Sequence, residues 1–288
     1  MKGYSSSIRL AVLHVNADTP PVVRSSGPSH VISLVDIHCH LLAGLDDGPA
    51  SMEEAIAMCR IARQDGTGVV AATAHLGELW PEVTPDRIRQ ATAELRSRLE
   101  QIRLALVVYP CAEVAIRPDV EEAWLRGDLL GVADGRGYLL LELPQGSFLD
   151  LRALVQRLGR LGVRPILAHP ERHPELLHEP GLAEALIRVG CLFQVSAQSI
   201  SQPASRRDAA ALKRWVRRGM VHLVGSDGHS PDRRPPRMAE VYGRIAQWAG
   251  ASVADRLCCI NGLAVCEGRP LRTRPPEAPK RRWFAWFR

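Results

Sequence analysis

The feature that most restricts the fold of this chain is an alternation of short apolar runs with amphipathic helical segments, sustained from about residue 34 to residue 268. Runs rich in leucine and β-branched residues predict strands, and strands that alternate with helices pair in parallel. The expected strands lie near residues 34–38, 68–74, 104–111, 137–142, 163–168, 191–195 and 221–225. The pattern predicts one α/β domain with a barrel-like sheet, and an open doubly wound sheet is the alternative.

Two of the helical segments carry clear start signals. In SMEEAIAMCRIARQDG, Ser51 can cap the helix, Glu54 completes a capping box and Gly66 ends the helix. In TPDRIRQATAELRSRLEQI, Thr84 is the expected N-cap and Pro85 takes the first helical position. These signals place helices after the first and second predicted strands.

Composition and charge exclude several classes of protein. The formal net charge of the 288 residues is +6, but residues 271–288 hold six basic residues against one acidic residue, which is +5 of that total. The rest is near neutral, so a nucleic-acid-binding body is not indicated. The chain has no apolar run long enough for a membrane span, and its N-terminus lacks the apolar segment of a secretory signal. Seven cysteines without a C-x-x-C pair indicate reduced thiols in a cytoplasmic protein.

Two terminal segments lie outside the regular pattern. Residues 1–33 are rich in serine and proline, and we interpret them as a flexible extension or as sequence upstream of the true start. Residues 269–288 form a basic tail in which a proline-rich stretch precedes PKRRWFAWFR. The predicted organisation is therefore an extension over 1–33, a folded domain over 34–268 and a tail over 269–288.

Six of the seven predicted strands end in, or are followed closely by, a residue that can bind a metal ion. These candidate ligands are His38, His40, His75, Glu113, Glu142, His169, Asp227 and His229. In a parallel barrel the carboxyl ends of the strands share one rim, where the active site lies, so residues spread over almost 200 positions would converge there. In the H-x-H of the first strand, alternation turns both imidazoles to the same side. Core packing does not account for six such endings.

The candidate ligands comprise five imidazoles and three carboxylates. This set suits zinc, manganese or iron and is large enough for two or three ions. We interpret the other five histidines as ordinary polar residues; they are His14, His30, His173, His178 and His222.

A cysteine nucleophile is the alternative chemistry. Cysteine-dependent phosphatases need an arginine six residues after the thiol; after Cys39 that position is Leu45. Cys111 and Arg117 match the spacing, but CAEVAIR has no glycine to form a phosphate cradle, and its Glu113 would repel phosphate. We therefore assign neither thiol a chemical role and expect Cys39 to face away from its histidine neighbours. No nucleophile elbow, P-loop or dinucleotide fingerprint is found either.

Taken in order, the motifs resemble those of the PHP (polymerase and histidinol phosphatase) superfamily: H-x-H at the first strand, a histidine after the second, AHPER in mid-chain and SDGH near the end. DIHCHLLAGLDDGP, LLLELP, AHPERHPELL and SDGHSPDRRPPR are similar, more narrowly, to the CpsB/CapC-type tyrosine phosphatases of bacterial capsule and exopolysaccharide loci. The resemblance extends over about residues 34–268.

The resemblance implies a distorted (β/α)7 TIM-like barrel in a single PHP domain, with two or three ions of manganese or another divalent metal. It also implies dephosphorylation of protein tyrosines, and all eight candidate ligands fall on ligand positions of the family. TAHLGELW departs from the family pattern, since Leu76 and Trp80 stand where more polar residues are usual. The departure puts substrate contacts in question, but not metal binding at His75.

The expected mechanism uses hydroxide, activated by the metal ions, to attack phosphorus in line without a phosphoenzyme. Arg172 and Arg234 fall on arginine positions of the family and are expected to bind the phosphoryl oxygens as catalytic residues. Asp46 and Asp47 either orient a histidine ligand or form the turn before the first helix, and we favour the turn.

Three functions remain open. The first is a tyrosine phosphatase acting on a tyrosine-phosphorylated protein, such as a membrane-associated autokinase that controls capsule or exopolysaccharide synthesis. The second is a small-molecule phosphomonoesterase such as histidinol phosphatase, and the third is a non-catalytic regulator that binds a kinase, against which the intact ligand set argues. No nucleic-acid partner is expected.

The tail suggests where the protein acts. PKRRWFAWFR combines cations with Trp and Phe, which favours a peripheral contact at the inner face of the membrane for a cytoplasmic protein. The alternatives are that the aromatic residues dock on the chain's own barrel, that they bind the kinase, or that the tail is simply solvated.

Overall fold

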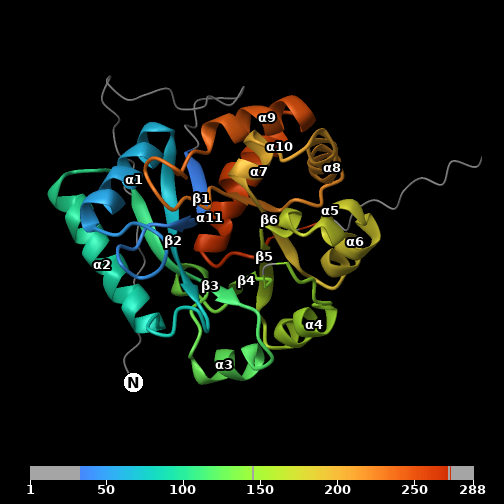
Figure 1. The fold of residues 1–288 in the computed structure, drawn as a ribbon, viewed down its shortest axis with the longest axis horizontal. Helices are drawn as coiled ribbons and strands as arrows, with labels where there is room; N and C mark the ends of the chain where they lie inside the picture. The colour runs from blue at the N-terminus through green and yellow to red at the C-terminus, as the bar shows by residue number, and fades with distance from the viewer. Residues whose placement is uncertain (1–32, 145, 272, 274–288) are drawn as a thin grey trace, which may run out of the picture.

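The computed structural model describes residues 33–144, 146–271 and 273 (Figure 1). The N-terminal extension apart from its last residue, and residues 274–288 of the basic tail, lie outside these residues, so what the sequence predicts for them stays a prediction. The strands are β1 (Leu34–His40), β2 (Thr67–Leu76), β3 (Val107–Ala115), β4 (Tyr138–Glu142), β5 (Arg164–Ala168), β6 (Leu192–Ser196) and β7 (Leu223–Gly225).

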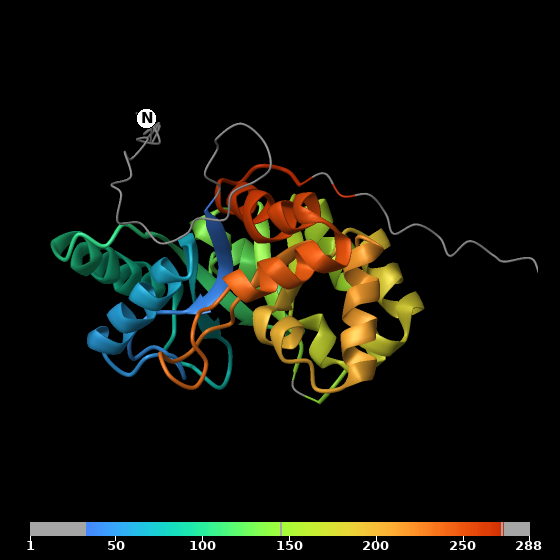
Figure 2. The same cartoon turned by 90° about the horizontal axis from the view of Figure 1, so that it is seen from above.

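Helices follow the strands and surround the sheet (Figures 1 and 2). The α-helices are α1 (Met52–Gln64), α2 (Pro85–Gln101), α3 (Val120–Arg126), α4 (Arg152–Arg160), α5 (Pro174–His178), α6 (Pro180–Arg188), α7 (Ala197–Ser201), α8 (Arg206–Arg217), α9 (Ala239–Ala249), α10 (Ala251–Asp255) and α11 (Asn261–Cys266). Two 3₁₀ turns and one π-helical turn complete the set: η1 (Val132–Asp134), η2 (Pro170–Arg172) and η3 (Arg256–Ile260). None of the helices in the described part of the chain combines the length and hydrophobicity needed to cross a bilayer.

All seven strands pair in parallel, in the order in which they occur along the chain. A doubly wound sheet reverses its strand order at a switch point, so the open-sheet alternative is wrong. Backbone bonds join β1 to the segment after β7: Asp227 N–H donates to His38 O (2.7 Å) and His40 N–H to Gly228 O (2.8 Å). Segment η3–α11 packs against both β1 and β7 along this seam. The fold is the nearly closed (β/α)7 barrel that the sequence predicts.

Both helix starts read from the sequence are confirmed. The Ser51 hydroxyl accepts from Glu54 N–H (3.3 Å), and the Glu54 carboxylate accepts from Ala50 N–H (2.8 Å), one residue earlier than in the usual capping box. At α2, the Thr84 side chain is the N-cap and Pro85 is the first helical residue. Each cap satisfies backbone donors that have no partner within the helix.

Side-chain alternation divides the core into two layers, because successive residues of a strand point to opposite faces. In β4, Leu139 and Leu141 belong to the outer layer between the strands and the helices. Tyr138 and Leu140 belong to the inner layer within the barrel. The same alternation turns Glu142, the last residue of β4, toward the inside of the rim.

Strand β1 needs an irregularity to present its histidines. Val35 lies in the inner layer, yet Cys39, four positions later on the same nominal face, lies in the outer layer. The pairing with β2 shifts register between Asp36 and Cys39, and a shift of this kind changes the face on which the following residues lie. As a result His38 and His40 both point into the barrel, and Cys39 packs outward as predicted.

Candidate metal centre

The predicted ligands converge around one buried carboxylate at the carboxyl end of the barrel. The Glu113 carboxylate lies 3.1 Å from His38 Nε2, 3.3 Å from His40 Nε2, 3.3 Å from His75 Nδ1 and 2.9 Å from His169 Nε2. β3, a strand of the middle of the sheet, supplies this carboxylate, and the imidazoles come from β1, β2 and the end of β5. Four imidazoles around one carboxylate form the centre of the cluster.

The remaining three predicted ligands extend the same cluster. Asp227 Oδ1 lies 3.5 Å from His38 Nε2 and 3.7 Å from His229 Nδ1. Glu142 Oε2 lies 3.5 Å from His75 Nδ1. The structure therefore brings all eight residues together, and their spread along the sequence is bridged by the shared rim of the barrel.

Within the cluster, three groups of donor atoms lie within 4.8 Å of one another and could each hold an ion, and His169 and Asp227 belong to none of the three. The groups are His40, Asp47, His75 and His229; His38, His40 and Glu113; and His75, Glu113 and Glu142. Histidine nitrogen and carboxylate oxygen in this mixture suit zinc, manganese or iron. Shared members between the groups mean that neighbouring ions would have ligands in common.

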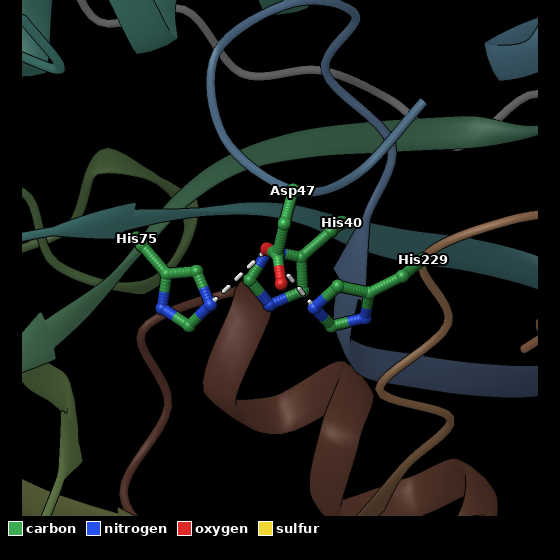
Figure 3. A group of neighbouring side chains, drawn as sticks. All are labelled: His40, Asp47, His75 and His229. Carbon is green, nitrogen blue, oxygen red and sulfur yellow. Dashed lines mark ion pairs between the residues drawn. The ribbon is translucent and has the colours of Figure 1, made fainter. Parts of the chain in front are cut away.

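Asp47 is a member of the first group that sequence reasoning missed. Its Oδ1 lies 3.4 Å from His75 Nε2 and 3.4 Å from His229 Nε2, and Figure 3 shows it between these two rings. Hydrogen bonds to His229 and His75 lower the pKa of the Asp47 carboxyl, so it is ionised at neutral pH. Our preference for a turn role is wrong for this residue.

Asp46, its neighbour, plays both of the roles that the sequence left open. Its Oδ1 accepts from Gly48 N–H (3.0 Å), which forms the turn. Its Oδ2 contacts His40 Nδ1 at 2.7 Å and accepts from His75 N–H at 2.9 Å. One carboxylate thus fixes the turn and also orients an imidazole of the cluster.

The donor set passes a chemical test for metal binding. Gln194 Oε1 lies 2.8 Å from Nδ1 of His38, and Asp46 holds Nδ1 of His40, so in both neutral rings the proton sits on Nδ1. The two Nε2 lone pairs then face each other at 3.2 Å, beside the Glu113 carboxylate. Lone pairs and anionic oxygen directed at one point repel unless a cation lies among them, so this arrangement fits a metal ion.

The field of the carboxylates also favours cations. Burial lowers the pKa of His40, but Asp46 and Glu113 raise it more, to about 9. Burial also lowers the pKa of His75, but the neighbouring carboxylates outweigh burial and raise this pKa to about 11. The largest of these contributions comes from Asp47. A pocket that draws protons onto buried imidazoles stabilises positive charge.

Two of the predicted ligands occupy backbone conformations that L-residues avoid. His169 has φ 32° and Asp227 has φ 54°, both in the left-handed region. Such conformations cost about 1–3 kcal/mol each and persist where the surroundings hold them. Asp227 is held by the donation of its N–H to His38 O at 2.7 Å. This backbone conformation directs both side chains into the cluster at the ends of β5 and β7.

Both predicted arginines lie at the edge of the cluster. The guanidinium groups of Arg172 and Arg234 each pair with Oδ2 of Asp227, whose Oδ1 faces His38. Arg172 also lies 3.4 Å from the hydroxyl of Ser196, at the end of β6. Two cations therefore border the cluster on the side of Asp227.

The thiols of Cys39 and Cys111 are unsuited to nucleophilic attack. Both are fully buried, and burial raises the pKa of each thiol above its usual range. Cys111 points into the inner layer of the barrel, while Arg117 pairs with Asp119. The C-x5-R match is therefore accidental.

Comparisons with known proteins agree with this site. The chain matches the family described as capsular polysaccharide synthesis, CpsB/CapC, over residues 34–267. It is 28% identical to the tyrosine-protein phosphatase YwqE of Bacillus subtilis over 262 residues, 88% of this chain and 100% of that protein. It is 29% identical to the tyrosine-protein phosphatase CpsB of Streptococcus pneumoniae over 234 residues, 79% of this chain and 96% of that protein.

Solved structures give the same result. One solved structure comes from work on YwqE from Bacillus subtilis and CpsB from Streptococcus pneumoniae, which it describes as "unique metal-dependent tyrosine phosphatases". It aligns with this chain with a TM-score of 0.79 at 27% identity, over 86% of this chain and 100% of that chain. A β-aspartyl dipeptidase from Fervidobacterium islandicum aligns with a TM-score of 0.50 at 12% identity, over 85% and 77%, and shows the fold alone. The chain therefore belongs to the CpsB/CapC family, as the match of its sequence to the family and the shared barrel fold show.

Proposed function

We propose that this protein is a metal-dependent protein-tyrosine phosphatase. The observation that carries the proposal is the buried cluster of imidazoles and carboxylates around Glu113, bordered by two arginines, in a family whose named members are tyrosine-protein phosphatases. The donor set serves a hydrolase in which water is the nucleophile. The buried thiols leave no cysteine route.

The cluster would hold two or three divalent ions, of which manganese is our proposal. The ligands would be His38, His40, His75, Glu113, Glu142, His169, Asp227 and His229, and Asp47 joins them. Ions bound there would lower the pKa of coordinated water toward neutrality and would neutralise charge on the phosphoryl oxygens. Glu113 holds the imidazoles of neighbouring groups in one arrangement, and Gln194 and Asp46 keep the Nε2 lone pairs of His38 and His40 directed inward.

Arg172 and Arg234 would bind the phosphoryl group. A planar guanidinium presents paired donors that match phosphate oxygens. Asp227 holds both arginines at the edge of the cluster, which places their charge beside the reacting centre. Their charge would stabilise the phosphoryl oxygens as the P–O bond breaks.

The proposed substrate is a tyrosine-phosphorylated protein, namely a membrane-associated tyrosine autokinase of a capsule or exopolysaccharide system. The family description supports this choice, because it names capsular polysaccharide synthesis. A cytoplasmic protein that acts on such a kinase would benefit from a membrane contact, for which the sequence PKRRWFAWFR is suited. Co-sedimentation with anionic liposomes tests the contact, comparing the full chain with one that ends at Pro279. Equal binding of the two chains would contradict it.

One assay tests the activity itself. The full chain is freed of metal by chelation, and its hydrolysis of a tyrosine-phosphorylated peptide and of histidinol phosphate is measured with and without added manganese. We expect manganese-dependent release of phosphate from the peptide and little from histidinol phosphate. His38→Ala should abolish most turnover while circular dichroism shows a folded barrel. Full activity after exhaustive chelation, or a preference for histidinol phosphate, would refute the proposal.

A further inference from the structure

A cleft of about 540 Å³ opens beside the candidate metal centre and has two chemically different parts. At one end it is lined by members of the cluster, among them His75 and Glu142. Elsewhere its lining is largely apolar and includes Leu79, Trp80 and Ile116. A cleft of this size, apolar on its walls and polar at one end, has the character of a small-molecule or side-chain binding site.

The segment that carries the apolar wall is held firmly against the barrel. Gly77 passes so close to β3 that a Cβ atom there would lie 2.7 Å from the Cβ of Ala115, which only glycine avoids. Trp80 N–H donates to Gly77 O, and Val83 N–H donates to Trp80 O, each at 3.0 Å. Val83 is buried in the outer core layer, and Trp80 packs against that layer. The wall is therefore formed before any ligand binds.

The orientation of Trp80 suits an aromatic guest. Its indole ring is parallel to the His75 imidazole within 5°, with 6.2 Å between the ring centroids. Aromatic rings prefer offset stacked or edge-to-face contacts with centroids about 4.5–7 Å apart. A ring that enters the cleft toward the metal centre passes a flat aromatic surface on its way.

Leu79 adds an apolar side chain without an internal partner. Leu79 is 89% exposed, the most exposed of the large hydrophobic residues in the described part of the chain, and it lines this cleft. An isolated exposed leucine needs no explanation, but this one adjoins Trp80 and the polar end of the same cleft. The position extends the apolar wall outward from the metal centre.

We infer that Trp80 and Leu79 determine specificity by holding the phenyl ring of phosphotyrosine while its phosphate reaches the metal centre. The inference rests on the proposed function and adds the residues that recognise the aryl part of the substrate. A phosphoserine side chain has no ring to place against this wall. The two residues therefore select aryl phosphates on a polypeptide over alkyl phosphates.

A second cleft gives room for the residues around the tyrosine. It measures about 460 Å³, and Trp80 and Arg117 line it together with the first cleft. Its lining contains none of the predicted metal ligands. Trp80 thus lies between the first cleft, which would hold the ring, and the second cleft, which can hold neighbouring residues of the peptide.

The test separates recognition of the ring from recognition of the phosphate. With manganese-loaded full chain, KM and kcat are measured for a phosphotyrosine peptide, and Ki is measured for inorganic phosphate, which has no ring. Trp80→Ala should raise KM about tenfold, and Leu79→Ala about threefold, from the loss of aromatic and apolar contact. Both should leave kcat and the phosphate Ki within about twofold, and Trp80→Phe should restore most of the affinity.

Two matched controls guard against general effects. Trp248→Ala removes another tryptophan that packs partly buried against the core, and Leu125→Ala removes another exposed leucine, and neither lines the cleft. Neither control should change KM. Metal content is measured in every variant, because Trp80 lies beside His75.

The outcomes are distinct. An unchanged KM in Trp80→Ala overturns the inference, and so does an equal loss of peptide and phosphate binding, which would mean that Trp80 acts through His75. If the unmodified chain hydrolyses no phosphotyrosine in the presence of manganese, the proposed function fails and the inference fails with it. Activity in the unmodified chain together with an unchanged variant overturns the inference alone.

Discussion

Replacing Asp46 with asparagine tests whether the loop after β1 tunes the metal centre. The Asp46 carboxylate makes three contacts: with His40 Nδ1 (2.7 Å), His75 N–H (2.9 Å) and Gly48 N–H (3.0 Å). Its side chain is fully buried, so water does not replace a lost contact. Because both of its oxygens accept, an asparagine in either orientation turns its NH₂ group toward a donor.

The expected loss follows from these contacts. A buried donor left without an acceptor costs about 1–3 kcal/mol. Partners that orient metal-bound histidines change metal affinity by about 10–100-fold, which is a cost of similar size. We therefore expect Asp46→Asn to weaken manganese binding by one to two orders of magnitude, while the ligand atoms themselves are all retained.

The assay is competition for manganese between the protein and a chromophoric chelator, read without any substrate. Asp65→Asn is the matched control, since Asp65 also accepts two backbone N–H groups, from Met238 and Ala239 at the start of α9, away from the cluster. The control should bind manganese like the unmodified chain. If Asp46→Asn binds within about twofold of the unmodified chain, the orienting role is refuted.

Three further predictions follow from other parts of the structure. Cys39→Ser and Cys111→Ser should keep most phosphatase activity, because both thiols are buried and outside the cluster; loss of activity in Cys111→Ser with fold and metal content intact would revive the cysteine mechanism. Arg172→Ala and Arg234→Ala should each lower kcat/KM by about 100-fold at unchanged metal content, and the double variant should lose less than the product, because both arginines contact Asp227. Burial and nearby Arg164 lower the pKa of His222 from 6.5 to about 3. Below pH 6.5 the unfolded chain therefore binds a proton at His222 that the folded chain does not bind. The free energy of unfolding falls for this reason as the pH drops from 6.5 toward 3. At pH 5 the loss of unfolding free energy from His222 is about 2 kcal/mol. Urea unfolding at pH 7 and pH 5 should therefore show that His222→Asn loses about 2 kcal/mol less stability between these two pH values than the unmodified chain does. The same pH dependence in both chains would contradict the assignment.

The barrel and the convergence of the candidate ligands could be predicted from sequence because two regular patterns coincide. Apolar runs locate parallel strands, and the ends of parallel strands meet at one rim, so Glu113 and His169 could be placed together from their positions alone. The face of β1 was the exception. Alternation predicted that His38 and His40 share a side, but the register shift that turns this side inward depends on pairing with β2 and leaves no sign in the pattern.

The residues that orient the ligands were harder to predict, for two different reasons. Asp46 and Asp47 lie in an irregular loop, where no periodicity tells which way a side chain points, and turn formation was the favoured explanation of both. Gln194 did leave a signal: it is a polar residue in the middle of the buried run LFQVS of β6, the one strand of the sheet that ends without a candidate ligand. A fully buried amide needs a partner, and its partner is His38.

The resemblance marks Leu76 and Trp80 as departures from the family pattern, and the structure places one of them at a strand end and the other in a loop. Leu76 is the last residue of β2 and is buried in the outer core layer, so its apolar character serves packing, and it also lines the cleft. Trp80 lies in the loop beyond the strand, where it packs partly buried against the core, stacks beside His75 and lines the cleft. The strand ends carry the candidate ligands, and their positions are fixed by the geometry of the whole barrel. The loop that follows can change without disturbing it, so it is the part of the fold in which the choice of substrate can vary.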